Sequence, residues 1–161
     1  MFERILVCLD GSKIAEQILP YATEQAQRFG SKLVLLRVVT VPGSAYMTSA
    51  TGIPVQTGEF IREEFRRQEA DIKTYLESVA QSVREKVVET ECVVLGPAHV
   101  GKAIVGYAQE HAIDLVCLAT HGHSGLGRVV SGSVADYVLR QAGIPILVVR
   151  PKATGVIRKS G

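Results

Sequence analysis

The amino-acid sequence predicts a doubly wound α/β domain, a parallel sheet with helices on both of its faces. Short runs that are almost entirely apolar alternate with segments that carry apolar residues at helical spacing, in the order βαβαβαβαβ. This alternation is typical of parallel strands joined by helical crossovers. A chain of 161 residues, 47% of them hydrophobic, is long enough for one well-buried domain and short for two, so we expect one core.

The first strand and helix are expected on either side of a polar turn. Arg4 to Leu9 (RILVCL) is apolar after its first residue, as in a strand that is covered on both faces. Asp10-Gly11-Ser12 then breaks the run, and its serine is placed to cap the helix that follows. Apolar residues recur at helical spacing from Lys13 to Phe29, and Pro20 inside this helix is expected to kink it because proline removes one backbone donor.

A long connection separates the second strand from a long helix. Lys32 to Val39 is predicted to be the strand, and Thr40 to Gly58 is rich in glycine, proline, serine and threonine. A connection of this length is usually either functional or disordered, so we weigh a flexible lid or partner contact against simple disorder. Glu59 to Val88 has the apolar stripe of an amphipathic helix. Packing on the sheet explains that stripe more simply than a coiled coil does.

The remaining elements follow the same alternation. Glu91 to Leu95 is predicted to be the third strand, and helical spacing resumes from Val100 to Ala112. Leu115 to Ala119 is the fourth strand, Val134 to Ala142 is the last helix, and Ile146 to Val149 is the last strand.

Composition and charge narrow the class of protein. The net charge is +2, but four basic residues and no acidic ones lie from Arg150 to the end, so the rest of the chain is slightly acidic. We therefore expect a domain at residues 1–150 that binds no nucleic acid, followed by a basic, flexible tail at residues 151–161. No apolar run approaches the roughly 20 residues that span a bilayer, so no membrane contact is expected.

Cysteine usage indicates a reducing compartment. Cys8, Cys92 and Cys117 each lie in an apolar run and have no CxxC spacing, so we expect three buried thiols that act as small hydrophobic residues. The odd number of cysteines and the absence of a secretion signal favour a cytoplasmic protein.

The stretch from Ala119 to Val134 is the strongest functional signal. It leaves a strand, continues through glycine and small polar residues, and enters a helix. Backbone N–H groups in such a loop can point inward because glycine tolerates the required φ angles, and the helix N-terminus adds partial positive charge. We therefore expect the phosphates of a nucleotide to bind there.

The position of Asp10 supports a ligand site at the same edge of the sheet. Ligands of doubly wound sheets bind beyond the carboxyl ends of the strands, where the strand order reverses, and Asp10 follows the first strand. Capping of its own turn and contact with a ligand are both open to this residue, and the two roles are compatible.

Two common nucleotide loops are excluded by spacing. The chain has no GxxxxGK[ST] motif, and the spacing of Gly122, Gly125 and Gly127 does not fit GxGxxG. A Walker-type ATPase and an NAD-dependent dehydrogenase are therefore disfavoured.

The pattern that does fit resembles a known family. Asp10 after the first strand, the Gly122-x9-Gly132-Ser133 loop and the closing Pro145-Ile-Leu-Val-Val-Arg resemble the universal stress protein family over roughly residues 2–150. The resemblance implies a flavodoxin-like sheet of five strands in the order 3-2-1-4-5. It further implies ATP in one branch of the family, which we expect to carry Mg²⁺ or Mn²⁺ on its phosphates, and a regulatory role in the stress response through an unidentified protein partner.

The resemblance also implies roles for individual residues. Asp10 would approach the adenosine, and the backbone of Val38 would meet the adenine. The ribose and phosphates would be held by Gly122, Gly132, Ser133 and Val134. The last strand, Ile146 to Val149, would pair with its copy in a homodimer, and a short apolar edge strand independently suggests such a covering.

One residue departs from the family pattern, because Ala119 stands where the motif has its first glycine. If that position needs a left-handed backbone, alanine costs roughly 1–2 kcal/mol and alters the loop. If it needs only a small side chain at a strand end, alanine is harmless. We favour the second alternative, since Ala119 ends an apolar run.

The sequence contains no clear catalytic or metal-binding set. His121 and His123 in the loop have no nearby cysteine or carboxylate, which makes them a weak metal signal, and Ser124 belongs to no evident Ser/His/Asp grouping. Arg128 is better placed than the histidines to neutralise phosphate. Two alternatives to an ATP-binding regulatory protein stay open, slow ATP hydrolysis or autophosphorylation, and an ATP-independent dimeric scaffold.

Overall fold

The structure, a computed structural model, describes residues 1–40, 58–86, 89–120 and 133–150. The connection predicted at residues 40–58 lies outside them except for its first and last residues, and the basic tail at 151–161 lies wholly outside. The predictions for a lid and for a separate tail therefore stay predictions.

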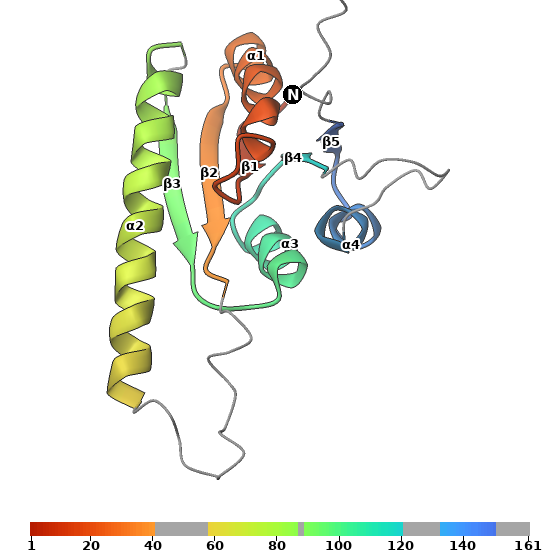
Figure 1. Ribbon diagram of the computed structural model, residues 1–161. Helices are drawn as coiled ribbons and strands as arrows, with labels where there is room; N and C mark the ends of the chain where they lie inside the picture. Colours follow the sequence, from red (N-terminus) through yellow and green to blue (C-terminus); the bar gives the residue numbers. More distant parts are fainter. Residues whose placement is uncertain (41–57, 87–88, 121–132, 151–161) are drawn as a thin grey trace, which may run out of the picture.

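Five parallel strands form one sheet in the order β3-β2-β1-β4-β5, which confirms the predicted fold class (Figure 1). The strands are β1 (Arg4–Cys8), β2 (Lys32–Val38), β3 (Thr90–Leu95), β4 (Leu115–Ala119) and β5 (Ile146–Val149). All four neighbouring pairs are parallel, and β1 lies in the centre between β2 and β4.

Helices cover both faces of the sheet, as predicted from the apolar strands. Side chains alternate along β2, so Leu33 and Leu35 join the core beneath α1 (Leu19–Phe29) and α2 (Gly58–Arg84). Val34 and Leu36 join the other core, beneath α3 (Val100–Glu110) and α4 (Ser133–Gln141). The two pairs of helices therefore lie on opposite faces of the sheet.

The segment predicted as one helix kinked at Pro20 is instead two helices. A short 3-10 helix, η1 (Ala15–Ile18), precedes α1, and Pro20 is the second residue of α1. The prediction of a kink was wrong because amides in the first turn of a helix need no intrahelical partner, so proline is tolerated there. The Ser12 hydroxyl accepts a hydrogen bond from the Ala15 amide at 3.0 Å, as its predicted capping role requires.

The long helix packs on the sheet, as expected, but it ends at Arg84 rather than at Val88. Its buried face contacts β3 and β2 and comprises Ile72, Leu76, Val79, Ala80 and Val83. The third strand begins at Thr90, one residue before its predicted start, and the fourth and fifth strands have the predicted bounds.

The three cysteines differ in burial. Cys117 is buried, and burial raises the pKa of its thiol to about 12. Cys8, at the end of β1, and Cys92, in the edge strand β3, are partly buried as whole residues, although burial raises the pKa of both thiols. The expectation of three fully buried residues therefore holds only for Cys117. None of the helices within the described ranges is long and apolar enough to cross a membrane.

Candidate functional site

The candidate site lies at the carboxyl edge of the sheet, between β1 and β4. The chain leaves β1 toward β2 on one side, whereas β4 pairs with β1 on the other side, so the strand order reverses between them. The segments that follow two such strands diverge to opposite faces, and a crevice opens between them.

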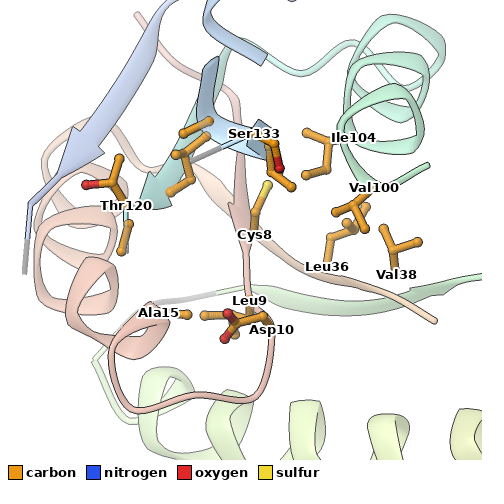
Figure 2. A pocket seen from close by; sticks show the side chains of 14 residues that line it. Cys8, Leu9, Asp10, Ala15, Leu36, Val38, Val100, Ile104, Thr120 and Ser133 are labelled. Carbon is orange, nitrogen blue, oxygen red and sulfur yellow. The ribbon is translucent and has the colours of Figure 1, made fainter. Parts of the chain in front are cut away.

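A pocket of about 190 Å³ occupies this crevice (Figure 2). The predicted site residues among the described ones all line it, namely Asp10, Val38, Ala119, Ser133 and Val134. These residues come from segments far apart in the sequence. Gly122 and Gly132 lie outside the described residues, as do His121, His123, Ser124 and Arg128, so their predicted placement stays a prediction.

Most of the residues that line the pocket were not among the predicted site residues. The further lining residues are Cys8, Leu9, Ala15, Leu36, Val100, Ile104, Leu118, Thr120 and Ala135. Strand and helix periodicity marks most of them as core, and nothing local to the sequence separates a core position from a pocket wall. The one available signal is position, because several of these residues lie at the carboxyl ends of strands.

The arrangement combines an apolar wall with polar groups at its ends. Figure 2 shows Leu36, Val38 and Val100 along one side, Asp10 at one end and Ser133 at the other. Such a cavity can enclose a flat apolar ring system while the polar ends orient its substituents. Ser133 begins α4, and the first backbone N–H groups of a helix, which have no partner within the helix, favour an anion.

Asp10 caps its own turn. One carboxylate oxygen accepts a hydrogen bond from the Ser12 amide at 2.8 Å, and the side chain is exposed at the pocket. The capping role considered from the sequence is therefore present. A carboxylate has about four lone-pair sites, so this bond is compatible with contact to a ligand.

The turn at Asp10 requires glycine at position 11. Gly11 has a φ of +88°, and a Cβ atom there would lie 2.5 Å from Nη1 of Arg37. The Arg37 guanidinium lies 5.5 Å from the centroid of the Tyr75 ring, and the Tyr75 hydroxyl donates to Glu16 at 3.1 Å. Burial, followed by the charge of Glu16, raises the pKa of Tyr75, so its hydroxyl stays protonated at neutral pH.

We expect Gly11→Ala to destabilise the protein and displace this turn. The left-handed backbone alone costs an alanine roughly 1–2 kcal/mol, and the methyl group must also push Arg37 aside. Urea denaturation should show a lower free energy of unfolding. Gly30→Ala is the control, because Gly30 has a similar φ of +65° but nothing within 4 Å of an added Cβ. Equal losses in the two variants would contradict a role for Arg37.

Ala119 does not have a left-handed backbone. It ends β4 in register with Val149 of β5, and the sole residue other than glycine with positive φ in the described ranges is Ala112. The structure thus agrees with the favoured alternative, in which this position needs only a small side chain.

The Ala119→Gly variant, which restores the family motif, is expected to gain no nucleotide affinity. Glycine inside a strand is destabilising by roughly 0.5–1 kcal/mol relative to alanine, so thermal denaturation should show a slightly less stable protein. A calorimetric titration of ATP should give the same affinity as the wild type. A clear gain in affinity would show that the alanine distorts the loop.

No metal centre is built from the described residues, since no group of three or more His, Cys, Asp or Glu side chains lies close enough to hold an ion. The cation expected from the sequence is one bound through phosphate oxygens, and that expectation concerns a ligand rather than a protein cage.

Comparisons of the sequence and of the structure with known proteins both find universal stress proteins. Residues 1–150 match the universal stress protein family. A universal stress protein of Synechocystis is 29% identical over 92% of this chain and 98% of its own length. The structure of UspA from Lactobacillus plantarum superposes with a TM-score of 0.72 at 27% identity, covering 92% of this chain and 98% of that one.

Two structures with the same fold contain nucleotides. An Arabidopsis thaliana protein of the family with AMP bound has a TM-score of 0.63 at 15% identity, covering 94% of this chain and 93% of its own. A universal stress protein in complex with cAMP has a TM-score of 0.58 at 20% identity, covering 92% of this chain and 97% of its own. At these identities the likeness concerns the fold.

Proposed function

The chain belongs to the universal stress protein family, and we propose that it is a regulatory protein that binds a nucleotide, ATP in preference to others, in the pocket at the carboxyl edge of the sheet. The observation that carries this proposal is that Asp10, Val38, Ala119, Ser133 and Val134 line one pocket. The bound AMP and cAMP of two proteins with this fold support it.

The residues of the pocket suit the parts of a nucleotide. The apolar wall of Leu36, Val38 and Val100 accepts a purine ring, and the Asp10 carboxylate accepts hydrogen bonds from ribose hydroxyl groups. The first amides of α4, at Ser133 and Val134, face the phosphates in this arrangement. Gly122 and Gly132 are expected to complete the phosphate loop.

A divalent cation belongs to the proposal as a ligand of the nucleotide. Mg²⁺ and Mn²⁺ prefer oxygen donors and are commonly held through substrate phosphates with few protein ligands. The donors described in the pocket, a carboxylate and hydroxyl groups, fit that preference. The ion would neutralise phosphate charge.

The test has two steps. Freshly purified protein is denatured and the released small molecules are separated by chromatography, and apo-protein is then titrated calorimetrically with ATP, AMP and cAMP. We expect co-purified nucleotide or measurable binding, strongest for ATP with Mg²⁺. If neither is found, the proposal fails and an ATP-independent scaffold replaces it.

We further propose that the protein acts as a homodimer through β5. This strand is at the edge of the sheet, and all four of its apolar residues, Ile146 to Val149, are only half-buried. No described strand pairs with the outer side of β5, and an apolar edge strand favours pairing with a second copy. Light scattering should give twice the monomer mass, and Val148→Lys should give the monomer.

A cytoplasmic location fits the three free cysteines.

A further inference from the structure

The pocket has walls on two helices that touch each other. Val100 and Ile104 of α3 line one part of the pocket, and Val134 and Ala135 of α4 line another. Both helices pack on the same face of the sheet and share one apolar core. The distance between the walls therefore depends on how closely the first turns of α3 and α4 approach.

The two helices approach each other closely at Gly101 and Tyr137. A Cβ atom on Gly101 would lie 2.8 Å from Cδ1, 2.9 Å from Cγ and 3.0 Å from Cβ of Tyr137. Any side chain at position 101 would thus overlap the base of the tyrosine. Because Cβ and Cγ cannot swing away by rotation about χ2, such a side chain would push the helices apart.

His99 adds a second contact at the same place. Its Nδ1 atom accepts the Lys102 amide at 3.4 Å and caps α3, and its ring lies 5.3 Å from that of Tyr137, inclined at 54°. Two features therefore keep the start of α3 close to α4. The His99 side chain caps α3 and contacts Tyr137, and Gly101 has no side chain that would separate the helices.

This contact is adjacent in sequence to both walls. Val100 precedes Gly101, and Tyr137 lies one turn after Ser133 and Val134. Helices move as nearly rigid bodies, so a separation imposed at the contact is transmitted to the pocket.

We propose that Gly101 and Tyr137 are positioning residues that set the width of the pocket, and thereby select the size of the ring system that it admits. The selection of a ring system rests on the proposed function. The control of pocket width by Gly101 and Tyr137 does not rest on it, because the reactivity of Cys8 measures pocket width without a ligand.

Cys8 reports on pocket width because it lines the pocket, and Figure 2 shows its sulfur among the wall residues. Burial raises the pKa of the Cys8 thiol, so alkylation should be slow in the wild type. A wider pocket admits both the reagent and water. If water lowers this pKa by one unit, the reactive thiolate fraction rises about tenfold.

The experiment compares Gly101→Ala with Gly106→Ala. Both add one methyl group to α3, but nothing lies within 4 Å of a Cβ at Gly106. Iodoacetamide labelling of each cysteine is followed by mass spectrometry. We expect the ratio of the Cys8 rate to the Cys117 rate to rise about tenfold in Gly101→Ala and to stay unchanged in Gly106→Ala. Cys117 is fully buried in the core on the other face, so general loosening would accelerate it too.

Tyr137→Ala supplies the rescue. It removes Cγ and Cδ1, the two atoms closest to a Cβ at position 101. Adding Gly101→Ala to Tyr137→Ala should therefore change the Cys8 ratio much less than adding it to the wild type. Equal effects in the two backgrounds, or an unchanged ratio in Gly101→Ala, would overturn the proposal.

Binding of ATP and of N6-benzyl-ATP then tests selection. In Gly101→Ala we expect ATP to bind about tenfold more weakly, about 1.4 kcal/mol, and the bulky analogue to lose less or to gain. If the wild type binds neither nucleotide, the proposed function fails while the Cys8 result still stands. If the wild type binds ATP and Gly101→Ala has the same relative affinities, the selection of ring size fails.

Discussion

Replacing Asp10 by asparagine is expected to weaken ATP binding by roughly 10- to 100-fold, because a hydrogen bond to a charged group contributes about 1.5–3 kcal/mol and each 1.4 kcal/mol is tenfold. Asparagine keeps an oxygen that can accept the Ser12 amide, so the turn bonded at 2.8 Å should persist. The change therefore removes charge while it retains the cap. Calorimetric titration measures the affinity, and thermal denaturation checks that stability is nearly unchanged.

Two further variants separate the roles of Asp10. Asp10→Ala removes both the charge and the cap, and it should lose binding and also about 0.5–2 kcal/mol of stability. Asp114→Asn is the matched control, because Asp114 accepts the amides of Glu3 and Arg4 at 2.8 and 2.9 Å at the opposite edge of the sheet. It should leave ATP affinity unchanged. Wild-type affinity in Asp10→Asn would reduce Asp10 to a turn cap.

Replacing Leu35 by alanine is expected to lower the free energy of unfolding by about 2–5 kcal/mol. Leu35 is 0% exposed, and it pairs with Val7 of β1 and Cys92 of β3 in the interior of the sheet. Two terms add in this loss. The removed methyl groups no longer contribute the free energy of their transfer from water to the core, and the cavity that they leave removes packing contacts of the surrounding side chains. Since small domains have roughly 5–15 kcal/mol of stability, this is a large fraction.

Urea denaturation measures this loss, and Leu139→Ala provides the control. Leu139 on α4 is 40% exposed, so the same chemical change should stay within about 0.5 kcal/mol. Leu35 faces the core beneath α1 and α2 rather than the pocket, so folded Leu35→Ala protein should bind ATP as the wild type does. A loss below about 1 kcal/mol would contradict the burial argument.

Much of the fold could be predicted because hydrophobic periodicity is a local property. The apolar runs of β1, β2 and β4 record that both faces of each strand are covered, and the observed sheet agrees. The prediction from residue type failed at Pro20, because the effect of a proline depends on its position within the helix. Pro20 was expected to kink a helix and instead lies in the first turn of one, where the backbone amides have no partner within the helix.

The candidate site was predictable only in part. Position in the chain singled out Asp10, and the family resemblance singled out Ser133; both residues line the same pocket. No sequence signal distinguished Cys8, Val100 or Ile104 from ordinary core residues, because periodicity states which side of an element is apolar but not which neighbour it meets.

The sequence by itself thus determined the alternation of strands and helices and pointed to the edge of the sheet where the pocket lies. Only the tertiary structure decided that Arg37 lies against Gly11 and that Tyr137 lies against Gly101. Both contacts join residues from separate elements at distances where a single methyl group matters. Such distances follow from how whole helices and strands pack on one sheet, which no local pattern records.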